Sequence, residues 1–212
     1  MPPLGWKKKR YGPRASTKAY ATKVIDTLKT KVNRLTAAID KKRKDNVAAG
    51  TIDYNGAINP VSATIQGDTF TDRDASEIKV TSLIFRGEWT IPSGNMNMRT
   101  IVFQDSSNQG TPPTVADVLN VTGSARAPNS PYVFEQKSRF KILADKRYAL
   151  SSNNDKIHPF KISISGDKLA KVHYTGSGST PLKGAIYLLN ISDQTGAALP
   201  AINVDWEMNF EG

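Results

Sequence analysis

The side chains with the clearest chemical potential are basic, and they crowd the first 44 residues of the chain. This segment holds 14 Lys or Arg against 2 acidic residues, a net charge of +12, whereas the other 168 residues carry 15 basic and 17 acidic groups. Clustered cations are typical of a segment that binds the phosphates of nucleic acid. We therefore predict a nucleic-acid-binding arm, residues 1–44, with these binding residues: Lys7, Lys8, Lys9, Arg10, Arg14, Lys18, Lys23, Lys29, Lys31, Arg34, Lys41, Lys42, Arg43 and Lys44.

Two aromatic residues interrupt the first basic cluster. Trp6 and Tyr11 lie in the sequence GWKKKRYGPR, and rings beside cations suit stacking on bases together with phosphate contact. The run from Lys7 to Arg10 could also act as a nuclear import signal in a host cell. The alternative for the whole arm is a solvated tail without a binding role, because blocks of like charge often do no more than solvate a chain.

Residues that could support catalysis are few and scattered. His158 and His173 are the only histidines, and the chain has no cysteine. The GxSxG, P-loop and GxGxxG signatures of nucleophile and phosphate sites are absent. Isolated carboxylates leave a glycosidase-like pair open, although surface loops explain them better. We therefore predict no enzyme, no catalytic residues and no cofactor, and leave the metal ligands unknown, since calcium could bridge carboxylates of neighbouring chains.

An amphipathic helix is the element expected to position the basic residues. Residues 1–15 combine prolines and glycines with the first cluster, and we expect them to be disordered. From Ser16, a suitable N-cap, the pattern predicts a helix over residues 16–44. Its apolar side chains recur at alternating steps of three and four, which favours docking on the body or packing against the same helix of other copies. The predicted subunit-contact stripe consists of Ile25, Leu28, Val32, Leu35 and Ile39.

Beyond Lys44 the sequence predicts an all-β body, residues 45–212. Gly, Asn, Thr and β-branched residues dominate, and residues 77–91 alternate so that Ile78, Val80, Ser82 and Ile84 share one face. A short helix is expected at 113–120, with Thr114 as its N-cap. Further strands are expected at residues 98–105, 139–150, 156–165, 168–175, 182–192 and 202–210. Turn signals separate them, and this many short strands indicates a β-sandwich or jelly roll.

Four blocks of the body carry a resemblance to a known family. They are TIQGD at 64–68, IKVTSLIFRG at 78–87, FQDSSNQGTPPTVADVL at 103–119 and QKSRFKILAD at 136–145. In order and spacing these blocks resemble the coat proteins of satellite tobacco necrosis virus and its relatives, including similar coat proteins of small circular single-stranded DNA viruses. A basic N-terminal helix precedes the blocks, as it does in that family.

The resemblance implies a fold and a function together. The fold is an antiparallel jelly roll of eight strands, and the function is self-assembly into the simplest icosahedral shell, T=1, of about 60 copies. Inward-facing N-terminal helices would package a single-stranded RNA or DNA genome, which makes the chain a virion component. Two alternatives stay open: a non-viral β-sandwich module that binds nucleic acid or carbohydrate and has a basic localisation tail, and a jelly-roll enzyme.

The chain shows no pattern typical of membrane insertion or secretion. No run approaches the ~20 apolar residues that a membrane span needs, and no apolar stretch of signal-peptide length follows the N-terminal basic residues. We therefore expect an unprocessed chain without a membrane partner.

Overall fold

The structure, a computed structural model, describes residues 15–39, 41–107 and 110–212. Side chains are described for these residues except 15–18, 33–39 and 124–125. The chain divides into two compact units, Met1–Asp40 and Lys41–Gly212, which are considered separately. In the first unit the described element is the helix α1 (Ala15–Ile39). The expected disorder of residues 1–15 falls almost wholly outside the described residues.

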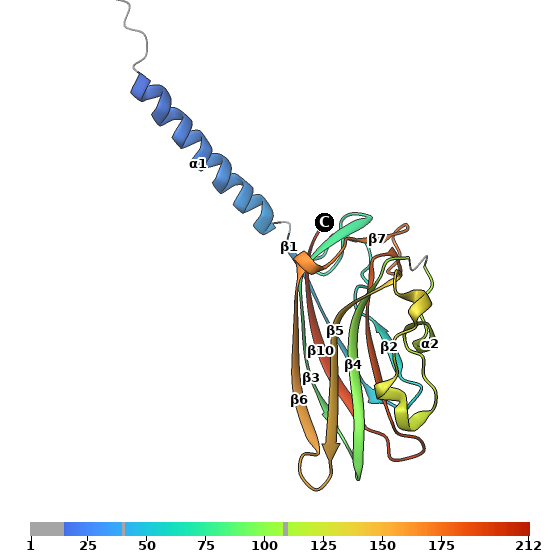
Figure 1. The fold of residues 1–212 in the computed structure, drawn as a ribbon. Coiled ribbons are helices and arrows are strands. Elements are labelled where there is room, and N and C mark those ends of the chain that lie inside the picture. The colour runs from blue at the N-terminus through green and yellow to red at the C-terminus, as the bar shows by residue number, and fades with distance from the viewer. Residues whose placement is uncertain (1–14, 40, 108–109) are drawn as a thin grey trace, which may run out of the picture. The chain divides into compact units, whose positions relative to one another are not determined.

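The second unit is a sandwich of two antiparallel sheets (Figure 1). Its strands are β1 (Lys41–Thr51), β2 (Ala57–Pro60), β3 (Glu77–Thr90), β4 (Asn95–Asp105), β5 (Phe140–Ser151), β6 (Ile157–Ser165), β7 (Val172–Tyr174), β8 (Pro181–Lys183), β9 (Ala185–Ser192) and β10 (Ala201–Glu211). Its helices are α2 (Val115–Val118) and three short 3-10 turns, η1 (Ser124–Asn129), η2 (Phe134–Gln136) and η3 (Gly166–Lys168).

The strand order is that of a jelly roll. One sheet runs β1-β10-β3-β6, with the short pair β7-β8 attached at the start of β3, and the other runs β2-β9-β4-β5. Successive long strands lie in opposite sheets except β4 and β5, which are neighbours. Apart from the short pair β7-β8, these two sheets contain eight strands, so the predicted all-β, eight-stranded jelly-roll sandwich is confirmed.

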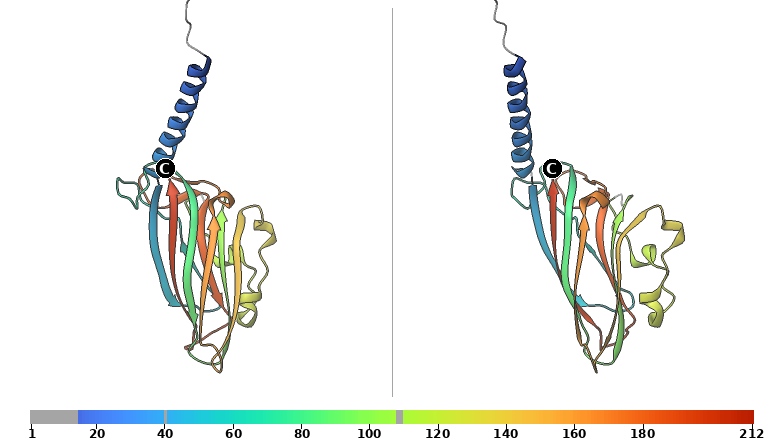
Figure 2. Two further views of the ribbon diagram at one scale, coloured as in Figure 1. Left: turned by 90° about the vertical axis from the view of Figure 1, so that its left-hand side faces the viewer. Right: turned by 60° about the vertical axis from the view of Figure 1, so that its left-hand side comes forward.

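Two apolar cores hold the second unit together. Residues that alternate along β3 and β10, such as Phe85, Trp89 and Met208, fill the space between the sheets. A second core lies between the β2-β9-β4-β5 sheet and the segment that carries α2, where Phe103 and Tyr187 stack with ring centres 5.6 Å apart. Figure 2 shows this segment along the outer side of that sheet. Because both faces are covered, β9 is buried at every residue.

The structure changes the expected pattern of β3. Ile78 and Val80 are buried as expected, but beyond Thr81 the buried residues are Leu83 and Phe85 in place of Ser82 and Ile84. The register of β3 on β10 shifts at this point, as Val80 pairs with Phe210 and Ser82 with Asn209. Such a bulge adds one residue to a strand and reverses which side chains face the core.

The helix prediction is wrong at its end. α1 stops at Ile39, and Lys41 to Lys44 form the first residues of β1, where they pair with Glu211 to Met208 of β10. The run KKRKD has no apolar side chains, so its sequence lacks the alternating pattern that predicts a strand. It can still form one, because β1 lies at the edge of its sheet and edge strands tolerate charge. The short helix near Thr114 is confirmed, and the Thr114 backbone N–H donates to the Asp117 carboxylate (2.7 Å).

Candidate nucleic-acid interface

The described basic side chains of α1 lie on its surface. Lys23, Lys29 and Lys31 are exposed. At 100° per residue, Lys29 and Lys31 flank the apolar stripe on opposite sides, and Lys23 lies about 160° from the stripe, nearly on the opposite face. The side chains of Lys18 and Arg34 lie outside the described residues, as do Lys7, Lys8, Lys9, Arg10 and Arg14.

Tyr20 joins this surface, and the sequence prediction missed it. Its side chain is 72% exposed, and it lines an open hollow of about 380 Å³ together with Lys23, Val24, Thr27, Leu28 and Lys31. An exposed ring beside two cations can stack on a base while the amines contact phosphates. The spacing of Tyr20 to Lys23 and Lys31 on one helix flank could have revealed it, as Trp6 and Tyr11 were recognised from the same combination.

The apolar stripe of α1 is exposed where its side chains are described. Ile25 is 51%, Leu28 55% and Val32 58% exposed. The side chains of Leu35 and Ile39 lie outside the described residues. Covering aliphatic side chains in this number with another apolar surface is favourable, so the stripe is a candidate contact surface that adjoins the cationic flank.

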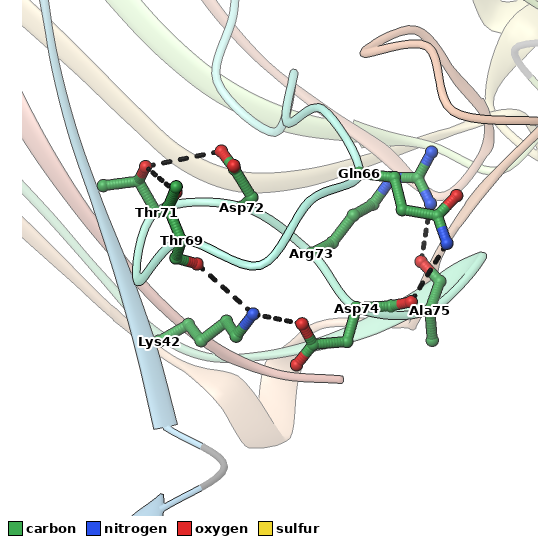
Figure 3. A network of polar contacts seen from close by, with 8 residues as sticks. All are labelled: Lys42, Gln66, Thr69, Thr71, Asp72, Arg73, Asp74 and Ala75. Carbon is green, nitrogen blue, oxygen red and sulfur yellow. Dashed lines mark hydrogen bonds and ion pairs between the residues drawn. The ribbon is translucent and has the colours of Figure 1, made fainter.

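Three of the four basic residues at positions 41–44 are engaged by the body. Lys42 is only 11% exposed, forms an ion pair with Asp74 and donates to the Thr69 carbonyl at 3.3 Å (Figure 3). Lys44 donates to the Ala63 carbonyl, and burial lowers the pKa of its amine. Both amines are already bonded to groups of the sandwich, so Lys42 and Lys44 fit a structural role better than the predicted phosphate contact.

Arg43 points the other way and is also paired. Its guanidinium donates to Asp45 (2.8 Å) and lies 3.4 Å from Glu207. Lys41, by contrast, is exposed. With residues 41–44 assigned to the sandwich, residues 1–40 retain 10 basic and 2 acidic residues, a net charge of +8, and the sandwich has a net charge of +2.

The two histidines of the sandwich each contact a side chain of another strand. His173 lies 3.1 Å from Glu77, and His158 on β6 packs against the Tyr148 ring. Among the residues with described placement, no three His, Asp or Glu side chains gather to hold a metal ion. Within the same residues, no helix is long and apolar enough to span a membrane.

Comparison with known proteins finds a family match over most of the chain. The family described as satellite tobacco necrosis virus coat protein matches residues 8–211. The capsid protein of Satellite tobacco necrosis virus 1 is 31% identical over 151 residues, which cover 70% of this chain and 72% of that protein. The coat protein of Maize white line mosaic Satellite virus is 27% identical over 155 residues, 69% of this chain and 68% of that protein. The small circular single-stranded DNA viruses in the expected resemblance are no part of this family description.

Proposed function

Because this chain belongs to the satellite tobacco necrosis virus coat protein family, we propose that it assembles with copies of itself into a closed shell that packages a single-stranded nucleic acid. The observation that carries the proposal is the division of the chain into a nearly neutral jelly roll and a separate cationic unit with a helix. The shell is the simplest icosahedral one, T=1, with about 60 copies. A structural role of this kind requires no catalytic residues.

The cationic unit supplies the binding of the genome. A charge of +8 on residues 1–40 gives on the order of 500 positive charges inside a shell of about 60 copies. Without nucleic acid these charges would repel one another, so neutralisation by phosphates favours assembly around a genome. Contacts through Lys23, Lys29 and Lys31 would be directed at the backbone and would hardly depend on sequence.

The apolar stripe of α1 supplies a second contribution. Ile25, Leu28 and Val32 would pack against the same helix of neighbouring copies, because mutual burial is favourable for aliphatic groups and phosphate offers them nothing. The cationic flank with Tyr20 then stays at the rim of the helix bundle, where nucleic acid can reach it. The two surfaces of one helix thus serve assembly and packaging separately.

The proposed location is the virion. A nuclear import role for Lys7 to Arg10 and a calcium bridge between subunits belong to the same proposal; Lys7 to Arg10 lie outside the described residues, and the described residues contain no cluster of calcium ligands within one copy. The non-viral binding module and the jelly-roll enzyme lose their support, because the family match spans nearly the full chain.

Electron microscopy of the purified full-length protein tests the proposal. We expect uniform small shells, and we expect the protein to purify with nucleic acid that is protected from nuclease. A variant that lacks residues 1–40 should lose the nucleic acid, which the ratio of nucleic-acid to protein absorbance measures. Monomers under all conditions would overturn the assembly proposal, and an unchanged absorbance ratio would overturn the role of the arm.

A further inference from the structure

We propose that the loop at residues 65–75, which connects β2 to β3, is a rigid contact element that inserts Phe70 into a second copy of this chain. The inference rests on the proposed assembly, since a shell requires each subunit to bury part of its sandwich surface against its neighbours. Four observations support it: a buried arginine that fixes the loop, further bonds that brace it, an exposed aromatic ring at its tip, and acidic residues that disfavour nucleic acid as the occupant.

A buried arginine fixes the loop to the sandwich. Arg73 is fully buried, and its guanidinium donates to the carbonyls of Thr64 (3.2 Å), Ala75 (2.6 Å), Gly176 (2.5 Å) and Gly178 (3.0 Å). Among the described residues, no carboxylate forms an ion pair with Arg73. The Tyr174 ring lies 4.3 Å from its guanidinium. Burying a charge without a counter-ion is costly, whereas an apolar side chain would fill the same space without that cost. The arginine therefore serves to hold the loop in one conformation.

Further bonds brace both sides of the loop. The backbone N–H of Arg73 donates to the Ile65 carbonyl at 3.0 Å, and the Gln66 amide donates to the Asp74 carbonyl at 3.1 Å. Lys42 joins the loop to β1 through Asp74 and the Thr69 carbonyl, as Figure 3 shows. A loop with this many cross-links has little conformational freedom left to lose when it binds a partner.

The tip of this braced loop presents an apolar surface. Phe70 is 63% exposed, while its carbonyl accepts a bond from the Arg43 N–H (3.3 Å). Ile65, at the start of the loop, is 51% exposed. A single exposed aromatic residue needs no explanation, but one held out by a fixed backbone matches the preorganised aromatic anchors of protein interfaces.

A second copy is the occupant that this chemistry favours. Asp68 and Asp72 lie beside Phe70 in the loop, and of the nearby described cations Lys42 and Lys44 are already engaged, so a phosphate at the ring would meet carboxylates first. An aromatic ring flanked by carboxylates is a poor site for nucleic acid. A protein surface can cover the Phe70 ring without a phosphate-binding cation, and the proposed shell contains many identical protein surfaces.

Photo-crosslinking in the assembled particle identifies the occupant directly. In the full-length protein, Phe70 is replaced by p-benzoylphenylalanine, which is also aromatic, and purified shells are irradiated. We expect covalent dimers on a denaturing gel, with the linked peptide from the sandwich of the second copy, and no dimers when subunits dissociated in high salt are irradiated. Crosslinks within one chain, to nucleic acid alone, or to nothing would overturn the inference.

A pair of substitutions tests whether the contact matters for assembly. Phe70→Ser should raise the protein concentration at which shells form about tenfold or more, and Phe70→Leu should raise it less, because leucine keeps most of the apolar surface. Neither change should alter thermal unfolding of dissociated subunits, since the side chain is exposed there. Equal thresholds for Phe70→Ser and the wild type would refute the contact, whereas a wild type that forms no shells would refute the proposed function instead.

Discussion

Arg99 on β4 and Asp145 on β5 show how single residues attach the outer layer to the sandwich. The Arg99 side chain is 1% exposed and donates to Asp145 twice (2.8 and 2.7 Å) and to the Ser130 carbonyl (2.7 Å). Burial, together with the hydrogen bond to Asp145, raises the pKa of Tyr132 to about 12, and its hydroxyl donates to Asp145 at 2.6 Å. One carboxylate thus holds the segment that carries α2 to the sheet.

Replacement of Asp145 should destabilise the subunit in a pH-dependent way. We expect Asp145→Asn to lower the free energy of unfolding by about 2–3 kcal/mol at neutral pH, because Arg99 is left buried without its carboxylate; this is below the value for a fully buried pair, as Asp145 is partly exposed. Burial opposes ionisation, but the bonds from Arg99 and Tyr132 outweigh it and lower the pKa of Asp145 below its ordinary value of 3.8.

The lowered pKa of Asp145 determines the pH range in which its ion pair stabilises the subunit. A lowered folded-state pKa contributes stability above 3.8 that is lost as the pH falls through the folded-state value. Urea unfolding of dissociated subunits should therefore show a constant difference between wild type and variant from neutral pH to about 4, and a shrinking one below it. Asp155→Asn, which removes the same charge from an exposed turn, should show no such difference. A difference that grows in acid would contradict the assignment.

At the scale of elements, the sequence predicts strands with a core-facing pattern and fails where that pattern is missing. β5, β6 and β10 alternate or carry strong β-formers, and their bounds lie within about two residues of prediction. β1 begins with four charged residues, and three of them, Lys42, Arg43 and Lys44, contact residues 63–74 and Glu207, far away in sequence. Arg73 was missed for the same reason, since its partners at Gly176 and Gly178 come together only in the fold.

Two truncations test the boundary between the units. Deletion of residues 1–40 should leave the sandwich as stable as before, because β1 stays complete. Deletion of residues 1–44 should cost about 2 kcal/mol or more, since it removes four residues paired with β10 together with the contacts of Lys42 and Lys44. Chemical unfolding of the two variants provides the measurement. Equal midpoints would return the boundary to Lys44, where the sequence alone had put it.

The role of the α1 stripe can be tested with two variants of equal charge. Leu28→Asp together with Leu35→Asp should prevent assembly, because carboxylates cannot be buried between helices, while the sandwich stays folded. Both changes lower the charge of residues 1–40 from +8 to +6. Thr22→Asp together with Thr30→Asp lowers it equally at exposed positions away from the stripe and should assemble almost normally. Light scattering compares the two, and equal assembly would rule out helix packing.

At the scale of the whole molecule, net charge is concentrated in one part of the chain. The sandwich, with a net charge of +2, can approach its copies without strong repulsion, whereas residues 1–40 hold +8 in a short segment. In the proposed shell, this separation would let the sandwiches contact one another while nucleic acid balances the charge of residues 1–40. The affinity for nucleic acid should then depend steeply on salt, and the affinity between subunits much less.

The salt dependence of binding locates the phosphate contacts. Replacement of Lys7, Lys8, Lys9 and Arg10 by Ala should reduce the slope of log affinity against log salt for a single-stranded oligonucleotide by about 2–3, because each phosphate contact contributes about 0.7 through counterion release. The matched control removes four exposed lysines of the sandwich, namely Lys146, Lys156, Lys161 and Lys183. That variant loses the same net charge but should keep the wild-type slope. Equal slopes for the two variants would show that total charge, and not the arm, determines binding.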